Sequence, residues 1–579
     1  MKDDPASHCA AQGLNTEDGG PSPSVQRGGS RTPPRPDDGG SGHSRAPPGT
    51  HNDIPAHSSP RNVKVGSAYE FLAALKRSRN TTIDLGGRTL SFVSSSVANP
   101  DLTVLNGTLK CRSLVVEPSA TNFCCRNLIF QFSQVGGAED AAADPLVAVR
   151  GTQGVVLEAC KFGDCGQGRP AASWAGDDAA CAGAGLCASD GAMVLAMGCE
   201  FNRNAGAGLV ADGPKTVVIA HCLWSGNNGT SGVLAQRGAE VKLERSGTCA
   251  GNRYVGMFAH GGGKIVATRV VCNDNHNDGA MAANGGSLTL DACKMVAISR
   301  SGVFVAEGSS KATVTGLEIV ARSVRRGQTE PVGDGIVLRA GASCRVRGAK
   351  IDGCLGALTV FGAGSRLRAS DVVVTNSRQG LRVCGGTCAL KRSTLDGCAV
   401  TAIEAAESDS SVTAVDVTVK SCGGRGVHVE RAALATLTKC VVERAGADGV
   451  FADGVGTVVE MEDVAVTRST SCGVLVLNGG RAHIQGGECT DGASFGVTVE
   501  GRGTAAKISG MVCARNARSG LVAMDGAEVA ATKCSVEGNA KYGGVSWGGS
   551  SSLVLEDCKV VGNGEAATFT CQGGTVTER

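Results

Sequence analysis

Three residues whose side chains could bind an anion and transfer a proton recur at a regular spacing: Arg382, Glu404 and His428. Arginine binds carboxylates and phosphates, and a carboxylate beside an imidazole can act as general acid and base. The intervals between them match a repeat in the surrounding sequence, so all three occupy equivalent positions. The same positions also suit a ladder of opposite charges that stabilises a sheet.

The repeat is marked by a small residue that begins an apolar triplet. These residues recur every 22–24 residues, with one interval of 33, at Gly185, Gly208, Gly232, Gly256, Gly279, Gly302, Gly335, Ala357, Gly380, Ala402, Gly426, Gly449, Gly473, Gly496, Gly520, Gly543 and Ala567. The first and third residues after each start are apolar, whereas the second varies. This alternation is typical of a strand with one buried face. Each unit is too short for a crossover helix, so it holds about three short strands.

Strand-only repeats that join in parallel wind into a β-helix, so the sequence predicts an all-β, single-stranded parallel β-helix of about 18–20 coils. Ser67 as a cap, with Phe71, Leu72 and Leu75 on one face, predicts a short capping helix within residues 67–80. Residues 1–60, rich in Pro, Gly and Ser, predict a disordered tail. Residues 61–145 hold the cap and first coils, and residues 146–579 hold the repeats, with insertions near 166–184 and 322–334.

Asparagine and cysteine keep fixed places in the repeat. The Asn positions near the end of a coil predict a turn ladder, at Asn204, Asn227, Asn252, Asn275, Asn376, Asn516 and Asn539. The Cys positions predict a packed inward column rather than metal ligands, at Cys199, Cys222, Cys293, Cys440 and Cys534. Trp224 shares its place with Phe162 and Phe201, which predicts a core position. Accordingly, no metal and no cofactor are expected.

The stretch "SAYEFLAALKRSRNTTIDLGGRTLSF" and the repeated apolar triplets with an Asn turn carry a resemblance. They resemble the cap and coils of right-handed parallel β-helix proteins of the pectin-lyase-like superfamily, over residues 62–579. The resemblance implies a right-handed solenoid. It also implies enzymes that act on acidic polysaccharides, but their DPHE and GHG motifs are absent from the sequence. The repeats are also similar to the substrate-recognition part of F-box ubiquitin-ligase adaptors, although no F-box is found.

Two surfaces are candidates for binding. The outward second position predicts an exposed apolar stripe for a protein partner, formed by Val210, Leu234, Phe258, Met281, Phe304 and Val337. Cover by the insertion or the tail is the alternative, and Trp174 in the insertion is a further candidate contact. The next strand predicts a basic stripe of Lys242, Lys311, Arg345, Arg347, Arg366, Arg368 and Lys391. This stripe suits an anionic partner or the ordinary surface of a solvated sheet.

Aromatic residues form only 3% of the chain, so stacking surfaces for sugars are scarce. We therefore expect a non-catalytic scaffold that binds a protein through an outward strand face. A diverged polysaccharide lyase, hydrolase or epimerase acting on acidic glycans is the first alternative, with Arg382, Glu404 and His428 as its catalytic residues. A ubiquitin-ligase adaptor is the second.

The N-terminal residues contain no apolar core of a signal peptide, and no run of 18 apolar residues occurs. An intracellular protein with reduced thiols and no membrane partner is expected. A net charge of +2 gives no reason to expect nucleic acid. Acidic polysaccharide remains open as a ligand. The last coil, from Ala567, lacks a capping helix, which leaves oligomerisation through that edge open.

Overall fold

The computed structural model describes residues 60–133, 144–164, 181–321 and 333–579. The predicted disordered tail therefore falls almost wholly outside the described residues. The same holds for most of the two predicted insertions and for the candidate contact Trp174.

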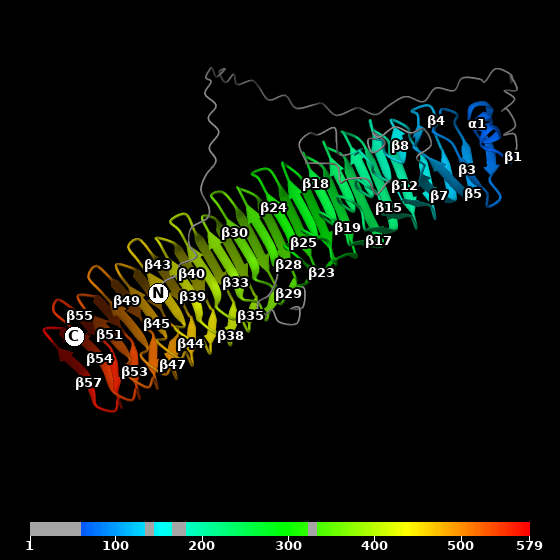
Figure 1. The fold of residues 1–579 in the computed structure, drawn as a ribbon. Helices are drawn as coiled ribbons and strands as arrows, with labels where there is room; N and C mark the ends of the chain where they lie inside the picture. Colours follow the sequence, from blue (N-terminus) through cyan, green and yellow to red (C-terminus); the bar gives the residue numbers. More distant parts are fainter. Residues whose placement is uncertain (1–59, 134–143, 165–180, 322–332) are drawn as a thin grey trace, which may run out of the picture. The chain divides into compact units, whose positions relative to one another are not determined.

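The described chain begins with β1 (Arg61–Lys64) and the single helix α1 (Ala68–Arg77) of these ranges. Ser67 caps α1, because its hydroxyl accepts a hydrogen bond from the Glu70 amide at 3.3 Å. Phe71 and Leu75 are buried on one face of the helix. The predicted capping helix is thus confirmed, and Figure 1 shows it at the blue end of the coils.

Each following coil contributes one strand to a first face, and successive strands pair in parallel. Its strands are β4 (Ser94–Val97), β6 (Ser113–Val116), β8 (Val147–Arg150), β11 (Leu186–Ser189), β14 (Leu209–Asp212), β16 (Val233–Gln236), β18 (Met257–His260), β21 (Ala280–Ala283), β24 (Ser301–Ala306), β27 (Asp334–Arg339), β30 (Gly356–Phe361), β33 (Gln379–Cys384), β36 (Thr401–Ala406), β39 (Arg425–Glu430), β42 (Val450–Asp453), β45 (Val474–Leu477), β48 (Val497–Glu500), β51 (Leu521–Met524), β54 (Tyr542–Trp547) and β57 (Ala566–Cys571). These strands confirm a parallel solenoid with about as many coils as predicted.

The other strands of each coil form a second and a third face. The second face includes β22 (Ser287–Asp291), β25 (Lys311–Thr315), β28 (Ser343–Arg347), β31 (Arg366–Ser370), β34 (Thr387–Lys391), β37 (Ser411–Val415), β40 (Leu434–Thr438), β43 (Val458–Glu462), β46 (Arg481–Gln485) and β49 (Ala505–Ser509). The third face includes β10 (Lys161–Gly163), β13 (Glu200–Asn202) and β38 (Thr418–Lys420). Longer strands such as β15 (Val217–Gly226) and β17 (Glu240–Ala250) continue from the second face into the third. Three strands per coil are therefore confirmed.

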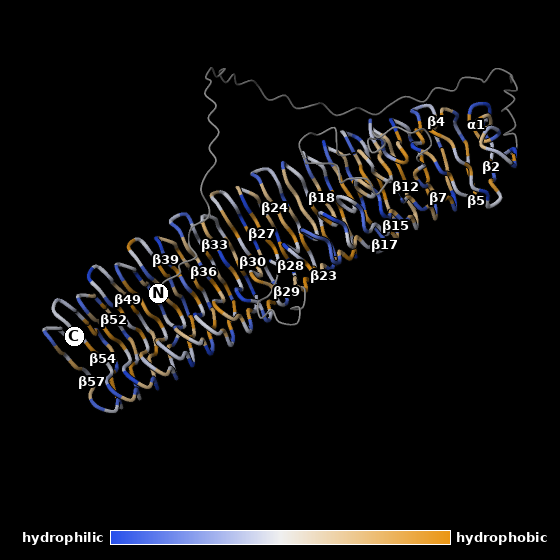
Figure 2. Tube along the Cα trace, viewed as in Figure 1, coloured by the Kyte–Doolittle hydropathy of each residue, from blue (hydrophilic) through white to orange (hydrophobic). Residues whose placement is uncertain are grey.

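The core fills the inside of the coils along their whole length. Inward residues of the first face, such as Leu209 and Ala211, are fully buried. Figure 2 shows apolar and polar segments side by side along the whole solenoid, and strands of the second face such as β25 and β28 alternate between exposed and buried residues. The start residue is small for a steric reason: a Cβ on Gly256 would lie 2.5 Å from the carbonyl oxygen of Gly279 and 2.8 Å from the Cys272 sulfur. The repeated glycine thus allows neighbouring coils to approach closely.

The asparagine ladder is confirmed in two runs. In the first, Asn204, Asn228 and Asn252 each donate through Nδ2 to the side-chain oxygen of the next member, at 2.9 Å, and the run ends at Asn275. In the second, Asn516 and Asn539 do the same at 3.0 Å, and the run ends at Asn563. Asn376 does not belong to a run, because its side chain is exposed and donates to Asp352.

Three predictions fail together in the coil that contains β15. Cys222 has a φ of +52° and is exposed, Leu223 takes its inward place, and Asn228 replaces the predicted Asn227 in the ladder. Trp224 pairs with Glu200 instead of stacking on Phe201, so it is not a core residue. The offset to the preceding coil is 23 residues along β14 but 24 residues along β15, so the turn between Asp212 and Val217 holds one extra residue. Every later position in this coil is therefore one residue farther from the start glycine than predicted, which reverses the side chains that face inward.

The other four predicted cysteines are buried, and Phe162 stacks on Phe201 with ring centroids 4.7 Å apart. The buried sulfurs lie at the bend between the second and third strands. There Cys199 donates to the carbonyl oxygen of Leu157 at 3.4 Å. No helix within the described ranges is long and apolar enough to cross a membrane.

Candidate functional site

The predicted polar row exists on the first face. Arg382 of β33 pairs with Glu404 of β36, and Glu404 pairs with His428 of β39. Glu430 lies two residues beyond His428 on the same strand. The tertiary structure therefore brings all three sequence-predicted residues together on adjacent strands.

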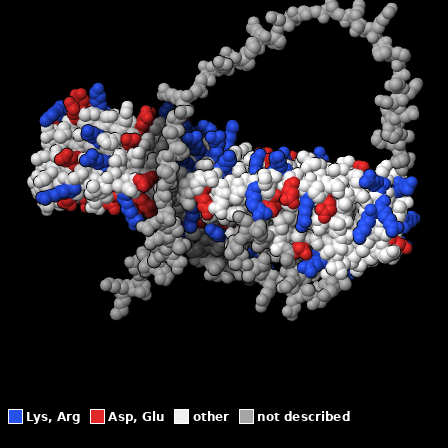
Figure 3. All heavy atoms as spheres, turned by 90° about the horizontal axis from the view of Figure 1, so that it is seen from above, with Lys and Arg blue, Asp and Glu red and all other residues white. Residues whose placement is uncertain are grey.

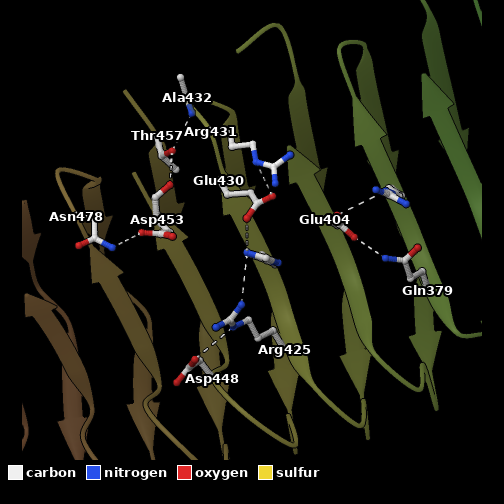
Figure 4. Close-up of polar contacts among 12 residues, drawn as sticks. Gln379, Glu404, Arg425, Glu430, Arg431, Ala432, Asp448, Asp453, Thr457 and Asn478 are labelled. Carbon is white, nitrogen blue, oxygen red and sulfur yellow. Dashed lines mark hydrogen bonds and ion pairs between the residues drawn. The ribbon is translucent and has the colours of Figure 1, made fainter. Parts of the chain in front are cut away.

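Neighbouring side chains bind the carboxylate of Glu404. Its carboxylate accepts a hydrogen bond from Gln379 Nε2 at 2.5 Å and lies 3.5 Å from Arg382 Nε (Figure 4). The Glu404 side chain is only 12% exposed. Both of these contacts come from side chains of the same face, so the carboxylate is already bound within the protein.

His428 lies between groups of opposite charge. Its Nε2 is 3.4 Å from a Glu430 oxygen and 3.5 Å from Arg425 Nη1. Arg425 also lies 3.5 Å from Asp448 (Figure 4). Its guanidinium is 3.5 Å from the centre of the Phe451 ring. Burial of the imidazole, followed by the positive charge of Arg425, lowers the pKa of His428. These two effects favour the neutral form of the ring.

The predicted apolar stripe is also one row, but the expectation that it is exposed is wrong. Val210, Leu234, Phe258, Met281, Phe304 and Val337 follow one another across six adjacent strands, and each is between 0% and 9% exposed. They form a second apolar cluster, separate from the core inside the coils.

Side chains from the bends that precede these strands cover part of this row. The Tyr254 ring meets the Phe258 ring edge-on at 6.0 Å, and the Arg300 guanidinium lies 4.5 Å above the centre of the Phe304 ring. Val255 from the preceding bend joins the cluster as well. Residues of the preceding bends thus help to bury Phe258 and Phe304, a contact that periodicity alone does not reveal. Cys181 and Ala184, at the described end of the predicted insertion, also pack in this cluster. Their role in partner binding remains a prediction.

Two carboxylates that sequence reasoning missed lie at the edge of this cluster. Asp278 immediately precedes a coil start, and its fully buried side chain is 3.8 Å from Arg300 Nη1. Burial raises the pKa of Asp278 to about 6. Asp334 of β27 accepts a hydrogen bond from the Gly356 amide at 2.9 Å, and burial raises its pKa as well. Both residues stand immediately before a start glycine, and this shared position is the sequence pattern that could have identified them.

A shallow groove of about 560 Å³ follows the second face beyond the basic stripe. Its polar lining comes from outward residues of adjacent strands, among them Glu460, Glu462, His483 and Lys507. Among the described residues, no group of three or more His, Cys, Asp or Glu side chains is arranged to hold a metal ion. The groove therefore offers charged and hydrogen-bonding groups without a metal centre.

Comparison with known proteins identifies the fold family. The model of the "right handed beta helix region" matches residues 225–378 and 401–563, which together exceed half of the chain. No match to a curated protein sequence was found.

The similar solved structures include two enzymes. One is the catalytic domain of a GH87 α-1,3-glucanase in complex with nigerose. It is 12% identical, has a TM-score of 0.26, and the similarity covers 66% of this chain and 67% of that chain. The other is the PL6 family alginate lyase AlyGC, 7% identical, with a TM-score of 0.20, and coverage of 90% and 100% respectively. At such low identities and TM-scores, neither similarity bears on the activity of this chain. The family match and the parallel coils together establish that the chain belongs to the right-handed β-helix family.

Proposed function

We propose that residues 60–579 form a non-catalytic scaffold that binds a protein partner through outward side chains of the first face. The observation that supports this proposal is the internal pairing of the polar row. Glu404 and His428, the two groups able to transfer a proton, are each held by neighbouring side chains and mostly shielded from solvent. A general acid or base must instead reach the proton it transfers.

Binding groups do project from this part of the first face. The Arg382 side chain is 40% exposed, and the Arg431 side chain at the end of β39 is 72% exposed. Val455, in the bend after β42 of the next coil, is 82% exposed. Arginines beside exposed apolar groups are typical of protein interfaces.

The binding role is tested with a photo-crosslinking amino acid at position 431, with the same group at Lys420 of the third face as control. We expect a discrete protein adduct from position 431 that is lost when Arg382 is replaced by Glu. Equal adducts from both positions, or none from position 431, would contradict the proposal.

A carbohydrate-active function is the second candidate, and one observation favours it. Asp334 is a partly buried carboxyl group with a raised pKa, as a general acid requires. The positive charges of Arg339, Arg382 and Arg300 act on it and would suit an acidic glycan. The Phe361 ring lies 5.0 Å from the Arg339 guanidinium.

The two candidates are separated by incubating the protein with polyuronates and neutral glucans and measuring new reducing ends and unsaturated products. We expect no turnover with the wild type. Turnover that Asp334→Asn or Glu404→Gln abolishes would establish the second candidate and reject the first.

A further inference from the structure

A compact group of cations lies on the second face, away from the first-face row. Six Lys and Arg side chains occupy outward positions of the consecutive strands β25, β28, β31 and β34, and all six are exposed: Lys311, Arg345, Arg347, Arg366, Arg368 and Lys391. We call these six residues the basic patch. Figure 3 shows Lys and Arg side chains gathered near the middle of the solenoid. Lys242, which the sequence assigned to the same stripe, lies apart on β17 and is 3.9 Å from Glu240.

The basic patch is not neutralised by its own strands. The other outward positions of these four strands carry Thr313, Thr315, Ser343, Ser370, Thr387 and Ala389. Among the residues that the structure describes, no carboxylate forms an ion pair with any of the six cations. Asp371, which follows β31, is bound by Arg392 through two hydrogen bonds of 2.9 Å. These hydrogen bonds, and to a smaller degree the charge of Arg347, lower the pKa of Asp371, so this carboxylate lies near one edge of the patch.

Two of the cations face each other directly. Arg345 of β28 and Arg368 of β31 are partners across adjacent strands. Like charges directly opposite one another destabilise a sheet, and neighbouring strands lie only about 4.8 Å apart. An anion between the two guanidinium groups would remove this repulsion and accept hydrogen bonds from both.

Acidic residues limit the patch on both sides. Asp291 on β22 precedes it, opposite Thr315 of β25. Glu460 and Glu462 on β43 follow it, beyond β37 and β40. Four strands span about 14 Å along the axis. An anionic membrane or a long polyanion lying on this face would also meet these carboxylates, whereas a short ligand would not.

The chemistry of the patch indicates an acidic peptide. None of the outward residues of the four strands is aromatic, so bases or sugars find no ring to stack on. Arg345 and Arg347 are two residues apart on one strand, as are Arg366 and Arg368. Alternate side chains of an extended peptide have the same spacing, about 6.6 Å. The hydroxyl groups between the cations can bind the peptide backbone.

We propose that the basic patch binds a short, extended acidic segment of a protein partner, with one of its carboxylates between Arg345 and Arg368. This surface lies on a different face from the proposed first-face interface. Its test and that of the proposed function therefore succeed or fail independently.

The test measures fluorescence anisotropy of a labelled peptide of alternating Asp and Ser with the full chain, against the same peptide with Asn in place of Asp. We expect the Asp peptide alone to bind, with an affinity that falls as salt is added. The double variant Arg345→Glu, Arg368→Glu should lose about tenfold or more in affinity. The matched control Arg481→Glu, Lys507→Glu reverses two exposed cations on β46 and β49 of the same face and should bind like the wild type.

Equal binding of the two peptides would overturn the proposal, as would wild-type affinity in the Arg345→Glu, Arg368→Glu variant. Competition distinguishes other ligands. The competitors are polyuronate, single-stranded RNA and phosphatidylserine vesicles. If one of them displaces the labelled peptide at a lower concentration of negative charges than the unlabelled Asp peptide does, the patch is assigned to that class of ligand and the peptide proposal is rejected. Circular dichroism on both double variants confirms that the coils remain folded.

Discussion

At the scale of single residues, buried polar groups such as Asn252 form hydrogen bonds with the coils before and after their own. Asn252 accepts hydrogen bonds from the backbone and side-chain amides of Asn228 and donates through Nδ2 to Asn275 and Ser225. Its neighbours have no water to replace these bonds, because Asn252 is fully buried. The ladder therefore fixes each turn onto the next.

Replacing Asn252 by Ala should lower the free energy of unfolding by about 2–3 kcal/mol, because buried donors and acceptors lose their partners. Asn376→Ala is the control, since Asn376 has the ladder spacing in the sequence but its side chain is exposed, and the buried Ser377 takes the inward place. Urea unfolding followed by circular dichroism measures both. Equal losses in the two variants would show that the ladder contributes nothing specific.

Asp278 makes stability depend on pH. Its folded-state pKa, about 6, lies above the ordinary value of 3.8, so its contribution is largest below pH 3.8 and is lost as the pH rises through 6. Relative to Asp278→Asn, the wild type should lose on the order of 3 kcal/mol between pH 4 and pH 8. Urea unfolding of both proteins across this range measures the difference, and exposed Asp291→Asn is the control. A difference that does not vary with pH would refute this assignment.

At the scale of the element, close approach of neighbouring strands explains why a small residue begins each triplet. The start glycines have ordinary negative φ values, so conformational freedom is not the reason. At Gly256 the limit is contact with the next coil at Gly279 and with Cys272. Ala at other starts, such as Ala357 and Ala402, shows that the limit varies between coils.

Gly256→Ala should therefore destabilise the protein, because its Cβ would overlap backbone and a buried sulfur. Gly308→Ala serves as control, since the nearest atom to a Cβ there is 4.0 Å away. Thermal unfolding of the two variants gives the comparison. A melting temperature for Gly256→Ala equal to that of Gly308→Ala would reject the steric explanation.

At the scale of the whole solenoid, each coil contacts mainly the coils before and after it, so stability is approximately a sum of local terms. A core defect should then remain local. Leu358 of β30 is fully buried, and Leu358→Ala should cost about 2–5 kcal/mol. Hydrogen exchange followed by mass spectrometry should show faster exchange in β27, β30 and β33 but unchanged exchange in α1 and β51. A uniform increase along the chain would mean that the coils unfold as one unit.

The sequence by itself determined the architecture and much of the alignment. The alternation of apolar residues and the spacing of the start residues are local properties of the chain, and they predicted the three strands per coil and the α1 cap. They also predicted that Arg382, Glu404 and His428 lie on adjacent strands, because a constant repeat length places equivalent residues side by side. The Asn ladder was found in the same way.

Only the tertiary structure decided which of these side chains are accessible. Cys222 is displaced from the core by one extra residue in the turn between β14 and β15, and a fixed count from the start glycine does not reveal which turn holds that residue. Phe258 is covered by the Tyr254 ring and Phe304 by the Arg300 guanidinium, and both covering side chains lie in the bend before the strand. Exposure is a property of all neighbours in space, whereas periodicity records only the direction in which a side chain leaves its strand.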